Sequence, residues 1–143
     1  MKKFLLIATV LFSSMIYAQD RNVSVKIQSD TITISLDDDN HDKSIYLHTA
    51  DINTKDDIIA SVLFWKDEQD WKRRFIINDE NGSDMTELTE KGKGIYCKKL
   101  SDAAATLEKG KTYFIYTAAL PRDPQKAMLV KVPRVLVCKL VVD

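Results

Sequence analysis

The chain has 143 residues, of which 45% are hydrophobic and 29% charged, with 21 Lys+Arg against 21 Asp+Glu. This composition fits one globular domain and excludes a disordered chain, which would be poor in apolar residues and high in net charge. Only 4 Gly and 3 Pro are present, which excludes a collagen-like chain, and the balanced charge provides no basic surface for nucleic acid.

The N-terminal segment has the three-part pattern of a bacterial signal peptide. Lys2 and Lys3 precede the apolar run 4–12, and Ala18 stands directly before the polar Gln19. The apolar run is shorter than the about 20 residues that a membrane-spanning helix needs. We therefore expect a signal peptide over residues 1–18, a single domain over 19–143, and a periplasmic or secreted protein. An uncleaved anchor or a buried strand is the alternative for residues 1–18.

The rest of the chain consists of short alternating or β-branched runs separated by polar clusters. Such runs at this spacing, with no long helical period and no apolar segment of membrane-spanning length, predict an all-β protein built as an antiparallel β-sandwich. The strands are expected at residues 22–28, 31–36, 44–49, 58–65, 71–78, 95–100, 113–120 and 134–142.

Up to three short helical turns and one tight turn are expected between the strands. Asp84 and Glu87 have the spacing of a capping box that would end at Gly92. Ser101 is expected to cap a turn over 102–109, and Asp123 to cap one over 124–128 that begins with proline. The pair 81–82, Asn-Gly, predicts a tight turn between two strands.

Residues 107–119 read Leu-Glu-Lys-Gly-Lys-Thr-Tyr-Phe-Ile-Tyr-Thr-Ala-Ala. This segment resembles the E–F corner of fibronectin type III and immunoglobulin-like sandwiches, with Leu107, Gly110 and Tyr113 at the matching positions. The resemblance implies that the Tyr113 hydroxyl is hydrogen-bonded to nearby backbone. It covers about a tenth of the chain, concerns architecture alone, and lacks the tryptophan that the family carries in its second strand.

The two C-terminal strands are predicted to expose an apolar patch. If Tyr113 points inward, alternation turns the intervening residues of its strand outward, and Lys139 marks the outward face of the last strand. The expected binding patch is Phe114, Tyr116, Val135 and Val137. Two interpretations stay open: the turn at 123–128 folds over the patch, or the patch binds another protein.

The chain has two cysteines, Cys97 and Cys138. In an exported protein they are expected to form a disulfide, because both share a strand face with core candidates. The bond would close a loop of about 42 residues and stabilise the fold by roughly 4 kcal/mol. Two free buried thiols are the alternative.

The remaining polar clusters do not predict a catalytic or metal site. Asp38, Asn40 and Asp42 alternate like calcium ligands, but Lys43 stands where an EF-hand loop needs glycine, so an acidic turn is the better interpretation. His41 and His48 lack the companions that zinc requires. We therefore expect no metal, no cofactor and no enzymatic activity.

Two functions of different classes follow. The first is a small exported protein that binds another protein, such as an inhibitor or immunity-type protein. The second is a carbohydrate-binding module, with Trp65 and Trp71 on either side of a charged turn as the sugar-stacking residues. A structural subunit of a surface assembly is a further alternative.

Overall fold

The computed structural model describes residues 22–37, 42–62 and 70–143. The predicted signal peptide lies outside these residues. Within them, no helix is long and apolar enough to cross a membrane. The described elements are β1 (Asn22–Ile27), β2 (Asp30–Ser35), β3 (Ser44–Leu47), the 3-10 helix η1 (Thr49–Asp51), β4 (Asp57–Val62), β5 (Trp71–Asn78), β6 (Asp84–Glu87), β7 (Thr89–Gly92), β8 (Ile95–Lys99), α2 (Leu100–Ala104), β9 (Thr112–Pro121), α3 (Pro124–Leu129) and β10 (Val135–Val142).

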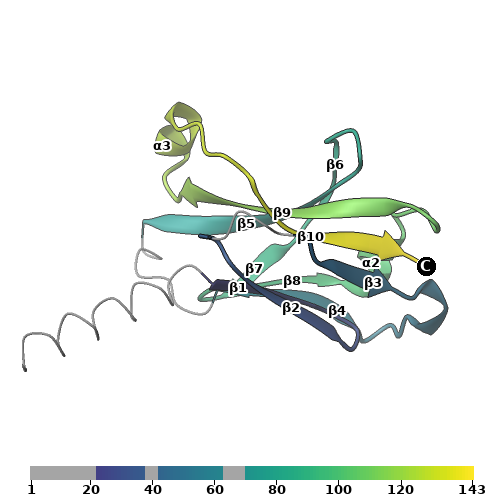
Figure 1. Cartoon of the computed structure of the whole chain (residues 1–143). Helices are drawn as coiled ribbons and strands as arrows, with labels where there is room; N and C mark the ends of the chain where they lie inside the picture. Colours follow the sequence, from purple (N-terminus) through teal and green to yellow (C-terminus); the bar gives the residue numbers. More distant parts are fainter. Residues whose placement is uncertain (1–21, 38–41, 63–69) are drawn as a thin grey trace, which may run out of the picture.

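The strands form two five-stranded sheets that pack face to face, as Figure 1 shows. Sheet A has the strand order β2-β1-β4-β8-β7, and sheet B has the order β3-β10-β9-β5-β6. Neighbouring strands are antiparallel except β3, which runs parallel to β10. The predicted all-β sandwich is therefore confirmed, with one parallel pair at the edge of sheet B.

The core lies between the sheets and follows from the alternation of apolar residues along the strands. In β1 every second residue is fully buried, as expected for a strand with one face on the core. Most of the largest fully buried side chains come from both inner faces: Ile27, Ile45, Leu47, Ile58, Phe75, Ile77, Ile115 and Leu140.

At each long edge of the sandwich, the chain links sheet A to sheet B. At one edge, β6 belongs to sheet B and β7 to sheet A, with Leu88 alone between them. Leu88 is only 5% exposed, and its N–H donates to the Phe75 carbonyl at 3.0 Å. At the other edge, the Lys43 ammonium donates to the Thr33 carbonyl of β2 at 3.3 Å. The crossing at Leu88 and the Lys43 contact thus link the two sheets at the two edges of the sandwich.

The structure corrects one predicted helical turn and confirms another. The capping box predicted at Asp84 and Glu87 is wrong, because this segment forms β6 and β7. Helix α2 is present, but it begins at Leu100 and ends at Ala104, so it is shorter than predicted, and Ser101 lies within it and does not cap it. Helix α3 begins after Asp123 as expected, and the Asp123 carboxylate accepts a hydrogen bond from the Gln125 N–H at 2.9 Å.

The two predicted turn features are also present. Gly82 has a φ of +82°, which a tight turn between β5 and β6 requires, and its N–H donates to the Asp79 carbonyl at 3.1 Å. The Tyr113 hydroxyl accepts a hydrogen bond from the Glu108 N–H at 2.8 Å, as in a tyrosine corner. The relation to the fibronectin type III and immunoglobulin-like families remains a prediction.

Candidate functional site

The outer side of sheet B carries a band of large apolar residues across three strands. Tyr116 of β9 lies opposite Leu136 of β10, and Val141 of β10 lies opposite Tyr46 of β3. Residues directly opposite each other share one face of a sheet, and Phe114 joins this face by alternation along β9. Tyr46 is 48% exposed and the others are half-buried. We call these five residues the apolar face.

This face differs from the predicted patch in β10. Phe114 and Tyr116 point outward as expected, but Val137 is 0% exposed, so its predicted outward orientation is wrong. Val135 lies opposite Thr117, which is also 0% exposed, and therefore belongs to the inner side. The cause is a β-bulge between Leu136 and Cys138, where the pairing register shifts. The extra residue reverses the alternation on either side of it.

Two bidentate arginine–carboxylate pairs border the apolar face on its β5–β6 side. Arg74 donates to both oxygens of Glu87 at 2.7 and 2.8 Å, and Arg134 donates to both oxygens of Asp84 at 2.7 and 3.1 Å. The hydrogen bond from Arg134 lowers the pKa of Asp84, and that from Arg74 lowers the pKa of Glu87. The face is thus bordered by charged pairs on this side, and it also contains Lys139, which lies opposite Phe114 and pairs with the Asp42 carboxylate at 3.0 Å.

The turn after β9 does not cover this face. Helix α3 contributes no buried residue, and Met128 and Leu129 are 87% and 86% exposed. Figure 1 shows α3 standing off the end of β9. The interpretation in which residues 123–128 fold over the patch is therefore wrong.

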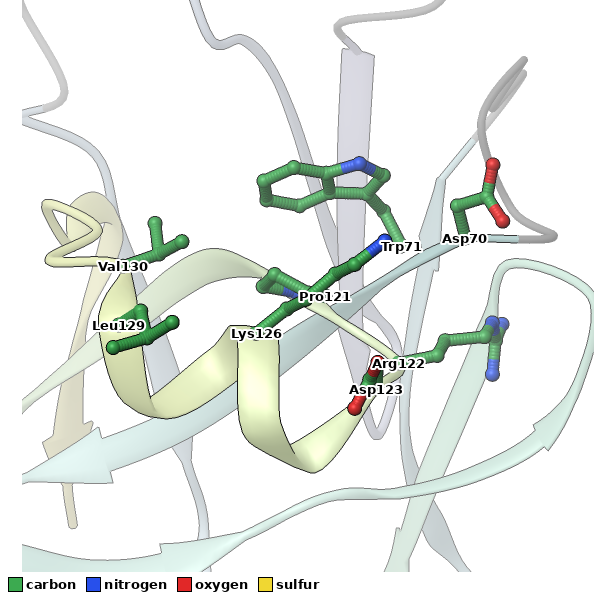
Figure 2. A pocket seen from close by; sticks show the side chains of 8 residues that line it. All are labelled: Asp70, Trp71, Pro121, Arg122, Asp123, Lys126, Leu129 and Val130. Carbon is green, nitrogen blue, oxygen red and sulfur yellow. The ribbon is translucent and has the colours of Figure 1, made fainter.

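A second candidate site is a pocket of about 560 Å³ between the start of β5, the end of β9 and α3. Its half-buried aromatic residue is Trp71, and the carboxylates of Asp70 and Asp123 and the ammonium of Lys126 also line it. Figure 2 shows these side chains around one hollow with Pro121, Arg122, Leu129 and Val130. The other predicted sugar-stacking residue, Trp65, lies outside the described residues.

The predicted disulfide is absent, because both cysteines are free. In β8, Tyr96 is 4% exposed and faces the core, so the next residue, Cys97, points to the outer side of sheet A. Cys138 is fully buried and faces the core from sheet B. Burial raises the pKa of Cys138 to about 12, and burial followed by the charge of Asp57 raises that of Cys97. Neither thiol is activated as a nucleophile.

The described residues contain no group of three or more His, Cys, Asp or Glu side chains that could hold a metal ion. Asp38, Asn40 and His41 of the acidic turn lie outside the described residues. The His48 ring nitrogen Nδ1 lies 3.2 Å from the Asp143 carboxylate, and both side chains are exposed.

Comparison of the chain with family models, curated proteins and solved structures finds no match.

Sequence reasoning missed Leu136 and Tyr46 as members of the apolar face. Alternation in 44–49 already separates Tyr46 from the core residues Ile45 and Leu47. Alternation does not reveal which strand lies beside β3, because β3 pairs with β10, about 95 residues further along the chain.

Proposed function

We propose that the protein is an exported, non-enzymatic β-sandwich that binds another protein through its apolar face, as an inhibitor or immunity-type protein does. The observation that carries the proposal is the composition of this outer sheet surface. The solvent side of an antiparallel sheet is usually polar, whereas here five large apolar residues lie on it and no helix among the described residues covers them.

The aromatic residues of the face are the expected anchors of the interface. Tyr46, Phe114 and Tyr116 have large side chains with few rotatable bonds, and binding energy in interfaces concentrates on such residues. The ion pairs Arg74–Glu87 and Arg134–Asp84 would form the rim. The charged groups of these pairs already form hydrogen bonds to each other. At the rim they would therefore favour a partner of complementary charge at little desolvation cost.

The test begins with a photo-crosslinking amino acid at position 116 in cells that produce the protein, to identify the bound protein. Affinity is then measured with purified components. Tyr46→Ala and Tyr116→Ala are each expected to weaken binding about 30-fold or more, the loss typical of an interface hot spot. The matched control is Ile95→Ala, which removes an apolar side chain of similar exposure from sheet A. Unchanged affinity in both tyrosine variants would refute the proposal.

A second candidate function, carbohydrate binding, is favoured by the position of Trp71. A half-buried indole that lines a pocket beside carboxylates can stack on a sugar ring while the carboxylates accept hydrogen bonds from the sugar hydroxyls. Binding to a glycan panel that Trp71→Ala abolishes and Tyr116→Ala leaves intact would support this function. A panel without any binding glycan would exclude it.

A further inference from the structure

The segment between β9 and β10 is an arm that carries exposed apolar side chains. We define the arm as residues 122–134, which include α3. Met128 and Leu129 are 87% and 86% exposed, and Val130 is 40% exposed. Leu129 and Val130 line the pocket beside Trp71, but most of the apolar surface of Met128 and Leu129 is open to water, and such surface often marks an interaction site.

The arm is also basic. It holds Arg122, Lys126, Lys131 and Arg134 against the single acid Asp123, a net charge of 4 − 1 = +3. Two of these cations fix the base of the arm to the sandwich.

Arg122 donates to both carboxylate oxygens of Glu90 on β7, at 3.3 and 3.0 Å, and Arg134 is paired with Asp84 on β6. Lys126 and Lys131 are exposed, and no described residue forms an ion pair with either. The outer part of the arm therefore combines an apolar tip with two exposed lysines, of which Lys126 shares a pocket with the carboxylates of Asp70 and Asp123.

We propose that the arm docks the protein on an anionic membrane surface, with Met128 and Leu129 entering the boundary between headgroups and acyl chains and Lys126 and Lys131 contacting lipid phosphates. This inference does not rest on the proposed protein-binding face, because Lys126, Met128, Leu129 and Lys131 are not among its five residues, although Arg134 at the base of the arm belongs to its rim. Exposed apolar residues with lysines beside them are a feature of interfacial membrane binding. Figure 1 places α3 at an extremity of the molecule, where it can reach a flat surface before the sheets do.

Shape and size favour a lipid surface over a protein partner for the arm. A standard protein interface involves about 20–30 residues on each side, whereas the arm offers three exposed apolar side chains on a convex tip. A membrane wedge needs only a few such side chains together with electrostatic attraction. Trp71, half-buried in the pocket beside α3, adds the aromatic residue that is favoured at headgroup depth.

The test is co-flotation with lipid vesicles. The protein is used as it is purified from the cells that produce it. Binding is expected to vesicles of phosphatidylcholine and phosphatidylglycerol in equal parts, to weaken with added salt, and to be absent from pure phosphatidylcholine. Lys126→Gln with Lys131→Gln should reduce partitioning about 25-fold, since each lysine near an anionic surface contributes about fivefold. Met128→Asp with Leu129→Asp should abolish it.

The matched controls are Lys55→Gln with Lys93→Gln, which removes two exposed lysines elsewhere, and Ile95→Asp on sheet A. All variants share the same N-terminal residues, so a difference between them reports on the changed positions. Circular dichroism should show every variant folded, because α3 buries no side chain. In addition, tryptophan emission should shift to the blue with vesicles for Leu129→Trp more than for Ile95→Trp.

Three results would overturn the inference. The wild-type protein does not float with anionic vesicles, or the arm variants float as the wild type does. Alternatively, the arm variants lose affinity for a purified protein partner while vesicle binding is unchanged or absent, which would make the arm a protein-docking element. None of these results bears on the apolar face, whose own test uses positions 46 and 116.

Discussion

Among single residues, Tyr113 shows how one side chain holds a connection between the two sheets. Its ring is 3% exposed, while its hydroxyl accepts the Glu108 N–H at 2.8 Å in the segment that leads from α2 to β9. A buried N–H without an acceptor is costly, so this bond fixes the path of the chain into β9.

Tyr113→Phe is therefore expected to lower the free energy of unfolding by about 1 to 2 kcal/mol, because it removes the acceptor and keeps the ring. Urea unfolding followed by circular dichroism measures the change. Tyr46→Phe is the control, since that tyrosine is 48% exposed and its hydroxyl has no hydrogen bond to a described residue. Equal stability of the two variants would show that the corner bond contributes nothing.

The cysteines provide the second prediction at this scale. Because Cys97 and Cys138 face opposite sides of their sheets, alkylation of the denatured, unreduced protein should modify both thiols. In the folded protein, Cys97 should react first and faster as the pH rises toward and above its ordinary pKa of 9.0, since the thiolate is the reactive form. Cys138 should stay unmodified until unfolding. If the denatured, unreduced protein carried no alkyl adduct, the two cysteines would form a disulfide and the prediction would be wrong.

Among the elements, β10 shows where sequence patterns stop predicting a surface. The alternation of β9 was predicted correctly for Tyr113, Ile115 and Thr117 because that half of the strand is regular. In β10 the same reasoning failed for the first three residues, which precede Cys138, and held for the rest of the strand, since the bulge inserts one residue and nothing in a run of valines and leucines marks its position. The apolar character of the face was predictable, whereas the identity of its β10 residues was not.

The bulge can be tested with substitutions at positions 116 and 137. Simple alternation predicts that both of these side chains point outward. Val137→Asp should cost at least about 3 kcal/mol or prevent folding, because it places a carboxylate at a position with 0% exposure. Tyr116→Asp should leave a folded protein, because its side chain is half-buried on the outer side. Thermal unfolding of both variants decides the question. A folded, wild-type-like Val137→Asp protein would mean that β10 has no bulge.

The β5–β6 hairpin carries the electrostatic prediction. The pKa values of Asp84 and Glu87 are lower in the folded chain than their ordinary values of 3.8 and 4.5, since Arg134 and Arg74 hydrogen-bond to the carboxylates. Each pair therefore contributes its full stability above the ordinary pKa and loses it as the pH falls through the lower folded value. For such partly exposed pairs the sum is about 1 kcal/mol.

The measurement compares unfolding between pH 7 and pH 3 for the wild type and for Arg74→Gln with Arg134→Gln. The double variant should be less stable near neutral pH and should lose less stability than the wild type below about pH 4.5. Lys55→Gln serves as the control for removal of an exposed cation. Parallel curves for the wild type and the double variant would contradict the role of the two ion pairs.

At the scale of the whole molecule, sequence patterns predicted the class of fold but not its connections. Local alternation identified strands, yet it did not reveal that the segment around Leu88 passes from sheet B to sheet A, because its short polar strands resemble a capped turn. The parallel pairing of β3 with β10 is equally invisible, since it joins segments distant in the chain. Both are tertiary arrangements that depend on how the two sheets pack.

Leu88 tests whether the two sheets form one cooperative unit. Its side chain is 5% exposed in the core, and its N–H donates to the Phe75 carbonyl at the point where the chain changes sheets. Leu88→Ala should cost about 2 to 4 kcal/mol, because it leaves a cavity where the sheets join. Hydrogen exchange should show the same loss of protection in β4 of sheet A and in β9 of sheet B. Met85→Ala, in the same edge but only partly buried, should cost less. Faster exchange confined to one sheet would show that the sheets open separately and that the Leu88 crossing does not couple them.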